Sequence, residues 1–256
     1  TTMTFTIAEI AWCHGGHRAK MSEAIQIAAA AGADACKFQW CSSPARLAER
    51  RHAQDYQVAY TRLAFSPVWL DELAQECTQA GLEFMCTVYL PEDISTVAPL
   101  VKRFKVASFE SGDIEFLEAH EGYSKPVIVS RSGPDLPWCG LTEEVASLHC
   151  VAAYPAPTEE MNLAVLRQDG IWDGLSDHSG FWLTGALAVA AGAKIVEVHF
   201  RLDSTPPDDP DYPHSLSLWD LDRYIATIRC AERMLGDGRK RMMPSEQRWA
   251  RYKVRP

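Results

Sequence analysis

The sequence predicts a TIM (β/α)8 barrel, and three observations support this fold class. Eight short apolar runs alternate with longer helical patterns along the 256 residues. The runs are continuously apolar, which is typical of parallel strands that are buried on both faces. No GxGxxG motif follows an early strand. That absence disfavours the doubly wound alternative, which binds phosphate groups with such a loop.

The predicted strands are rich in β-branched and aromatic residues. In chain order they span residues 4–12, 35–40, 82–89, 103–109, 126–132, 147–154, 174–179 and 193–200. The predicted helices span residues 18–33, 66–81, 93–101, 113–121, 158–168, 182–192 and 217–235. In the second helix, Ser66 and Pro67 are start signals and Gly81 is a stop signal.

One β/α unit is shorter than the others. The fifth and sixth predicted strands are separated by a short stretch that contains Pro134, Pro137 and Gly140. Proline and glycine disfavour a helix interior. We therefore expect the fifth helix to be reduced or replaced by a loop, within a single barrel domain that covers residues 1–256.

Composition excludes several classes of function. The net charge of -9 disfavours a general nucleic-acid binder, which would present a basic surface. No apolar run reaches the length of a membrane span, and the first residues lack the features of a signal peptide. The eight cysteines include no CxxC pair. We therefore expect a protein of the reducing cytoplasm, without a disulfide framework.

Polar residues gather at the ends of the predicted strands. In a barrel these carboxyl ends and the loops that follow them form the active site. Buried charges need partners, so this convergence is difficult to explain by packing alone. The residues are Glu9, His14, Lys37, Gln39, Thr87, Tyr89, Lys105, Ser108, Glu110, Ser130, Arg131, Tyr154, Ser176, Asp177, His178, Glu197 and His199.

Two histidines stand at the ends of the last two strands. Either His178 or His199 alone is compatible with an ordinary core histidine. As a pair on adjacent strands they predict a divalent metal site, because two imidazoles suit Mn, Zn, Fe, Co or Ni. Such a site leaves positions open for water and substrate. We interpret His149 as structural, and His17, His52 and His120 as surface residues.

The lysines of the second and fourth strands allow two interpretations. Lys37 and Lys105 can form structural ion pairs with Glu9 or Glu110. Alternatively they form a cradle for a phosphate or carboxylate, with hydroxyl groups as further donors. The hydroxyl groups in question belong to Ser108, Ser130 and Ser176.

A set of motifs resembles the sialic-acid synthase family, the phosphoenolpyruvate-dependent enzymes that make N-acetylneuraminate and related nonulosonic acids. In order the motifs are IAEIxxxHxG, AGADACKFQ, FKVAS, LHCxxxYPAP, GLSDH, GAKIVEVHF and PSE. They run from about residue 5 to residue 247. The resemblance implies a TIM barrel followed by a small antifreeze-like (SAF) domain. It also implies a divalent metal, usually Mn2+, with Mg2+, Co2+ or Zn2+ as alternatives.

The resemblance also implies roles for individual residues. His178 and His199 match the two metal ligands. Glu110 matches a carboxylate placed for proton transfer. Six further residues match the groups that hold the phosphate and carboxylate of phosphoenolpyruvate: Lys37, Thr87, Lys105, Ser108, Ser130 and Ser176. Glu9, Gln39, Tyr154 and Asp211 match positions around the metal-bound water and the acceptor.

Several positions depart from the family pattern, mainly on the acceptor side. Cys13 and Ala152 stand where asparagines are expected, and Phe109 replaces a glycine. Arg131 occupies the place of a small residue and suggests an added anionic group on the substrate; it can equally pair with Asp135 or Glu110. The chain ends soon after the PSE motif. We therefore expect no SAF domain, and either a homodimer or a separate SAF-like protein as partner.

Three functions remain open from the sequence. The first is a metal-dependent synthase that condenses phosphoenolpyruvate with an aldehyde, such as an open-chain N-acyl-amino sugar, to give a 2-keto-3-deoxy acid and phosphate. The second is a metal-dependent aldolase or lyase that acts on pyruvate or another 2-keto acid. The third is a non-catalytic subunit or one half of a split enzyme.

Overall fold

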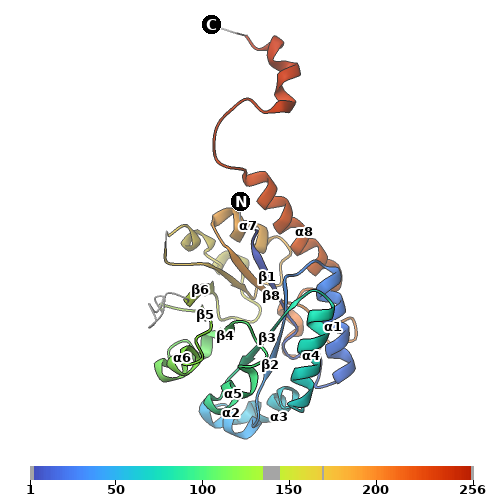
Figure 1. Ribbon diagram of the computed structural model, residues 1–256, viewed down its shortest axis with the longest axis vertical. Helices are drawn as coiled ribbons and strands as arrows, with labels where there is room; N and C mark the ends of the chain where they lie inside the picture. Colours follow the sequence, from blue (N-terminus) through green and yellow to red (C-terminus); the bar gives the residue numbers. More distant parts are fainter. Residues whose placement is uncertain (1–2, 135–144, 169, 255–256) are drawn as a thin grey trace.

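The computed structural model describes residues 3–134, 145–168 and 170–254 and contains one ring of parallel strands (Figure 1). The hydrogen-bonded order is β3-β2-β1-β8-β7-β6-β5-β4, and β3 contacts β4, which brings the ring nearly to closure. The predicted TIM barrel is confirmed. The strands are β1 (Phe5–Glu9), β2 (Ala35–Trp40), β3 (Glu83–Val88), β4 (Phe104–Val106), β5 (Val127–Arg131), β6 (Val145–Cys150), β7 (Gly174–Asp177) and β8 (Ile195–His199).

Helices follow most strands and cover the outside of the ring (Figure 1). They are α1 (Arg18–Ala30), α2 (Pro44–Arg50), α3 (Gln57–Tyr60), α4 (Val68–Gln79), α5 (Ile94–Val97), α6 (Ile114–Glu121), α7 (Thr184–Ala191) and α8 (Leu218–Leu235). The expectation that the fifth barrel helix is reduced or replaced by a loop concerns mainly residues 135–144, which lie outside the described residues.

Two predicted helices differ from the structure. The helix expected at 93–101 is limited to α5, because Pro99 disfavours helical backbone at the residue before it. The helix expected at 158–168 consists of two 3-10 turns, η5 (Thr158–Glu160) and η6 (Leu163–Arg167). Asn162 between them has φ 43°, a left-handed conformation that interrupts an α-helix.

One histidine was also placed wrongly by sequence reasoning. His120 was expected at the surface, as were His17 and His52. Both of the latter are exposed, but His120 is buried in α6. Its Nδ1 lies 2.7 Å from the carbonyl oxygen of Phe116, and its ring packs edge-on against Phe104. An imidazole can be buried in this way because one local backbone bond satisfies it.

The interior of the barrel has an apolar layer and a polar layer. The apolar layer is built by Phe5, Ile7, Ala35, Met85, Ile128, Ala146, Leu148 and Ile195. Side chains two positions apart in a strand point to the same face. Two residues beyond Ile7, Ala35 and Ile195, the same strands therefore bring Glu9, Lys37 and Glu197 into the interior. All three are buried, toward the carboxyl ends of the strands.

The contact between β7 and β8 depends on a glycine. A Cβ atom at Gly174 would lie 1.8 Å from the carbonyl oxygen of Ile195, so no other residue fits there without moving the strands. This close approach sets the distance between β7, which His178 follows, and β8, which ends at His199.

The segment that follows α8 leaves the barrel. Figure 1 shows it leading away from the ring to the 3-10 helix η8 (Pro244–Tyr252), whose residues are almost all exposed. Within the described parts of the chain, none of the helices combines the length and apolar character needed to cross a membrane.

Candidate functional site

A cavity of about 920 Å³ opens at the carboxyl ends of the strands. Every strand of the ring, or the loop that follows it, contributes to its wall, as expected for the active face of a barrel. Residues in that wall include Trp12, Lys37, Gln39, Arg51, Thr87, Lys105, Ser108, Glu110, Ser130, Tyr154, Ser176, His178, Glu197, His199, Asp211 and His214. Most of the predicted site residues therefore share one cavity.

Four charged residues form a lysine–glutamate cluster at its floor: Glu9, Lys37, Lys105 and Glu197. Lys37 forms an ion pair with Glu9, and its Nζ lies 3.5 Å from Glu197 Oε2. Lys105 Nζ lies 3.4 Å from Glu197 Oε1. All four side chains are buried. The two positive and two negative charges are thus compensated within the protein, which buried charges require.

Hydroxyl groups complete this cluster. Lys37 Nζ donates to Thr87 Oγ1 at 3.1 Å, Lys105 Nζ donates to Ser130 Oγ at 2.7 Å, and Ser176 Oγ donates to Glu197 Oε1 at 2.9 Å. Burial alone would raise the pKa of Glu197, but Lys105 and Lys37 lower it to about 2. Burial lowers the pKa of Lys105. Ser108 begins the 3-10 turn η4 (Ser108–Glu110) after β4 and also faces the cavity.

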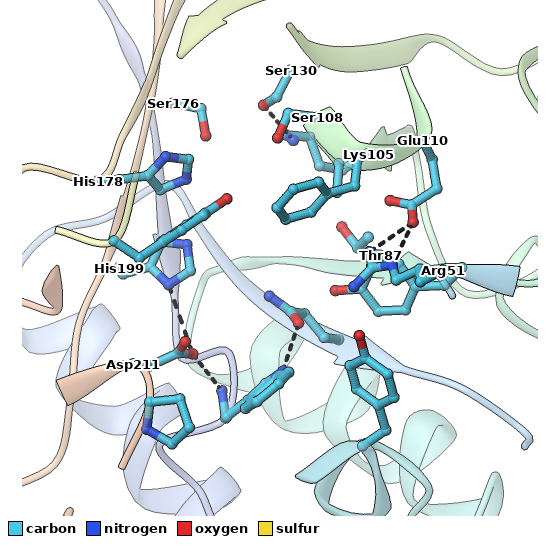
Figure 2. Close-up of a pocket in the computed structure, with 18 of the residues that line it drawn as sticks. Arg51, Thr87, Lys105, Ser108, Glu110, Ser130, Ser176, His178, His199 and Asp211 are labelled. Atoms are coloured by element: carbon cyan, nitrogen blue, oxygen red, sulfur yellow. Dashed lines mark hydrogen bonds and ion pairs between the residues drawn. The ribbon is translucent and has the colours of Figure 1, made fainter. Parts of the chain in front are cut away.

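Glu110 lies across the cavity and is paired with an arginine that sequence reasoning missed. Its Oε1 accepts hydrogen bonds from Arg51 Nε at 2.8 Å and Arg51 Nη2 at 2.7 Å (Figure 2). The guanidinium also lies 4.4 Å from the ring centre of Tyr89. Burial raises the pKa of Glu110, and Arg51 partly opposes this. The second carboxylate oxygen, Oε2, has no hydrogen-bond partner among the described residues.

On the opposite side of the cavity, His178 and His199 lie with ring centres 5.3 Å apart (Figure 2). His178 Nδ1 donates to the carbonyl oxygen of Val151 at 2.9 Å, because a carbonyl only accepts. This bond leaves the lone pair of His178 Nε2 available to a ligand. Burial lowers the pKa of His178 to about 4 and that of His199 well below its usual value, so both rings are neutral near pH 7.

The loop after β8 adds two more possible ligands. The ligand atoms of His199, Asp211 and His214 all lie within 4.8 Å of one another, which makes them a group that can hold a metal ion. Asp211 was predicted at the site, whereas His214 was not. Together with His178, these residues are called the histidine cluster below.

The histidine cluster fits a divalent metal by its chemistry. It offers neutral imidazoles and one carboxylate, which are ligands of transition metals. Neither ring nitrogen of His214 has a hydrogen-bond partner in the described part of the chain, although both are buried. Nδ1 of His199 also lacks one; it lies 4.0 Å from Asp211 Oδ2. Burial raises the pKa of Asp211 to about 7 in the absence of a cation.

Of the three remaining predicted residues, Tyr154 and Gln39 lie in the cavity wall, whereas Arg131 does not. Tyr154 is partly exposed, with its ring centre 4.6 Å from that of His178. Gln39 Oε1 accepts a hydrogen bond from Trp12 Nε1 at 3.1 Å in the cavity wall. Arg131 is buried on β5 with Nη1 3.5 Å from the carbonyl oxygen of Ser111, and it is not among the residues of the cavity wall.

Asp177, next to His178 in the sequence, points away from the cavity. Its Oδ2 accepts a hydrogen bond from Tyr224 of α8 at 2.8 Å, and its Oδ1 accepts one from the backbone of Ser179 at 2.8 Å. It is therefore a positioning residue for the loop that carries His178. Adjacent side chains at a strand end point to opposite faces. The sequence did not show whether Asp177 or His178 was the one that faces the cavity.

The comparison with known families identifies the chain. The family model described as NeuB family matches residues 24–240. The chain belongs to the NeuB family. The resemblance seen in the sequence motifs is thereby confirmed, together with the expectation of an enzyme of the synthase class.

Individual relatives of this NeuB family member cover almost its whole length. A protein of Methanocaldococcus jannaschii is 32% identical over 95% of this chain and 75% of its own length. The N,N'-diacetyllegionaminic acid synthase of Legionella pneumophila is 28% identical over 94% of this chain and 76% of its own. A crystal structure of the N-acetylneuraminic acid synthetase of Leptospira borgpetersenii, in complex with citrate, superposes with a TM-score of 0.84 at 26% identity. It covers 98% of this chain and 91% of that one.

Proposed function

We propose that this NeuB family barrel condenses phosphoenolpyruvate with an open-chain N-acyl-amino sugar aldehyde. The single observation that carries the proposal is one cavity in which two buried lysines face a cluster of histidines and a carboxylate. The first group suits an anionic donor, and the second suits a metal and an aldehyde oxygen. The names of two of these relatives, an N,N'-diacetyllegionaminic acid synthase and an N-acetylneuraminic acid synthetase, support the class of acceptor.

The lysine–glutamate cluster would hold the donor. In this proposal Lys37 and Lys105 bind the phosphate and carboxylate of phosphoenolpyruvate, with the hydroxyls of Thr87, Ser108, Ser130 and Ser176 as further donors. Glu197 holds both ammonium groups in place before the donor arrives, because it lies within 3.5 Å of each. Such preorganised charge lowers the cost of orienting the donor during the reaction.

The reaction forms one carbon–carbon bond and releases phosphate. C3 of phosphoenolpyruvate attacks the aldehyde carbon, water adds to C2, and the C2–O bond to phosphate breaks. The products are a 2-keto-3-deoxy acid and inorganic phosphate. The proton transfers are assigned to Glu110, whose free Oε2 and raised pKa suit the task, with Glu9 and Tyr154 as further candidates.

A divalent metal held by His178 and His199 would supply Lewis-acid polarisation of the acceptor oxygen. We propose Mn2+, with Mg2+, Co2+ and Zn2+ as alternatives. Gln39 and Asp211 would contact the acceptor, and Arg131 is assigned an indirect role in acceptor binding from its buried position on β5. The single-domain organisation and the homodimer or SAF-like partner remain predictions.

The first test is phosphate release from phosphoenolpyruvate by the metal-loaded protein with a panel of N-acyl-amino sugars. Wild type should release phosphate only when metal and one acceptor are both present, with an equal amount of 2-keto acid. Lys105→Met should lower kcat/KM for phosphoenolpyruvate by about a thousandfold or more, because it removes a charge that the phosphate needs. Lys102→Met is the matched control, because Lys102 is an exposed lysine three residues away.

Two outcomes would contradict the proposal. Condensation with pyruvate but no phosphate release from phosphoenolpyruvate would show an aldolase. No reaction with either donor, from folded and metal-loaded protein, would favour a binding subunit or one half of a split enzyme.

A further inference from the structure

We propose that His214 is a direct metal ligand, so that the site has three imidazoles, from His178, His199 and His214, and the carboxylate of Asp211. Compared with a site of two histidines, for which Mn2+ is proposed above, a third imidazole shifts the preference toward the alternatives Zn2+ and Co2+, because imidazole suits these metals and oxygen ligands suit Mn2+. The inference concerns metal binding itself and does not depend on the synthase reaction.

The first argument is proximity. Ligand atoms of His199, Asp211 and His214 lie within 4.8 Å of one another. Two ligand atoms of one Zn2+ ion are at most about 4.2 Å apart, so small side-chain movements would bring this group around a single ion. The ring centres of His199 and His214 are 4.8 Å apart, and those of His178 and His214 are 6.3 Å apart. His214 Nε2 lies 3.5 Å from Asp211 Oδ1.

The second argument is the missing hydrogen bonds of His214. Its side chain is 1% exposed, yet neither ring nitrogen has a hydrogen-bond partner among the described residues. The buried imidazoles of His120 and His178 each lie within hydrogen-bond distance of a backbone carbonyl, of Phe116 and Val151 respectively. Buried His14 accepts a hydrogen bond from the backbone nitrogen of Gly16 at one ring nitrogen, so His214 differs in having a hydrogen bond at neither. A buried polar group without a hydrogen bond is costly, so the two ring nitrogens of His214, of which Nε2 lies 3.5 Å from Asp211 Oδ1, indicate a ligand shared with that carboxylate.

The third argument is that the backbone holds His214 in place. The loop after β8 returns to the strand, where Leu216 N donates to the carbonyl oxygen of His199 at 2.9 Å and Arg201 N donates to that of Leu216 at 2.9 Å. Gly180, with φ 63°, lets the loop after β7 approach His214 closely, since a Cβ there would lie 3.3 Å from His214 Cα. The imidazole is thus brought to the site by two neighbouring loops.

The carboxylate of Asp211 is also held in a position where it can bind the same metal ion. Its Oδ2 accepts a hydrogen bond from the backbone nitrogen of Trp12 at 2.9 Å, and its Oδ1 faces His214. The carboxylate offsets part of the charge of a dication while the three neutral rings supply nitrogen ligands. A histidine pair alone would lack this preference for nitrogen-binding metals.

The test compares Zn2+ and Mn2+ affinities of metal-free wild type, His214→Ala and His214→Gln, measured by chelator competition. We expect either variant to bind Zn2+ at least tenfold more weakly and Mn2+ only a few-fold more weakly, so that the Zn2+/Mn2+ preference falls. His17→Ala is the control, because His17 is exposed and neither it nor its sequence neighbours line the cavity. Circular dichroism and thermal unfolding confirm that each variant folds.

A second measurement needs no variant. X-ray absorption of the Zn2+-loaded wild type counts coordinated imidazoles through their multiple-scattering signal. Three imidazoles are expected. Two or fewer would overturn the proposal, as would unchanged Zn2+ and Mn2+ affinities in folded His214→Ala. Because neither readout uses turnover, a failure here is distinct from a failure of the proposed synthase reaction.

Discussion

The lysine–glutamate cluster and the histidine cluster share one cavity but differ in how their polar groups are satisfied. In the first, each charge has an oppositely charged neighbour, and the two lysines also reach hydroxyl groups of Thr87 and Ser130. In the second, ring nitrogens of His199 and His214 have no hydrogen-bond partner among the described residues.

This difference indicates two ways of preparing a site. The charges of the lysine–glutamate cluster are compensated without a ligand, although Glu9 Oε2 and Glu197 Oε2 have ion pairs and no hydrogen bond among the described residues. These ion pairs contribute to the stability of the ligand-free barrel. In the histidine cluster, the buried ring nitrogens without hydrogen bonds destabilise the metal-free protein. Metal binding would satisfy these nitrogens and remove this unfavourable contribution. Removing a residue of the first cluster should therefore lower the stability of the ligand-free protein in addition to its effect on the donor, whereas removing a residue of the second should act mainly on metal affinity.

The largest effect is expected for Lys37→Met. It leaves Glu9 buried without its cation and Glu197 with only one, so the free energy of unfolding should fall by about 3–5 kcal/mol. Urea unfolding measures this.

The double variant Glu9→Gln/Lys37→Met should recover most of the loss, because it removes the unpaired charge and Lys105 still faces Glu197. If the double variant loses the sum of the two single effects, the ion pair does not stabilise the cluster.

A smaller effect is expected from acid on the metal-free protein. Burial lowers the pKa of His178 to about 4, from a usual value of 6.5. Between pH 6.5 and pH 4, His178 therefore binds a proton in the unfolded chain but stays neutral in the native protein. The contribution of the neutral His178 ring to the free energy of unfolding is fully present above pH 6.5 and is lost as the pH falls toward the native pKa. Glu197 adds to the loss only below its usual pKa of 4.5, where the unfolded chain takes up a proton that the native carboxylate, with a pKa of about 2, does not.

Thermal unfolding between pH 6.5 and pH 4 tests this difference. Replacing His178 by Asn should reduce the pH dependence by about 1.4 kcal/mol per pH unit, the contribution of one proton. Saturating metal should raise the unfolding temperature of wild type more than that of the variant. An unchanged pH slope in His178→Asn would contradict the assignment of a neutral buried ring.

The smallest effect is expected for Tyr224→Phe, which acts behind the histidine cluster. It removes the hydroxyl that donates to Asp177 and leaves a buried carboxylate oxygen without that bond. Stability should fall by about 1–3 kcal/mol. Metal affinity should fall only a few-fold, because His178 keeps its bond to Val151. The control is Tyr123→Phe, at an exposed tyrosine; a loss of metal affinity as large as that of a ligand variant would contradict the supporting role of Asp177.

Much of the fold and part of the site could be predicted because their signals are local. Apolar runs and helical patterns depend on neighbouring residues, so the eight strands were found at nearly the correct positions. Lys37, Lys105, His178 and His199 stand at the carboxyl ends of the predicted strands, and in a barrel these ends form one site. Pro99 shows the limit of this approach, since it shortens a helix that the apolar pattern alone extended.

The partners of these residues required the tertiary structure. Arg51 and Glu110 are 59 positions apart, and nothing near Arg51 in the sequence indicates a cavity. His214 lies close to Asp211 in the sequence, so its loop position was a usable signal. Its approach to His199 nevertheless depends on the return of the loop to β8. His120 shows the reverse case, because it looked exposed and is buried against Phe104.

The sequence by itself determined the order of strands and helices, the family and the set of side chains at the carboxyl ends of the strands. These follow from periodicity and motifs, which are read along the chain. Only the tertiary structure decided which charges neutralise one another and which imidazoles remain without a hydrogen bond. The physical reason is that pairing and burial depend on distances between segments far apart in the sequence, and these are set when the ring of strands closes.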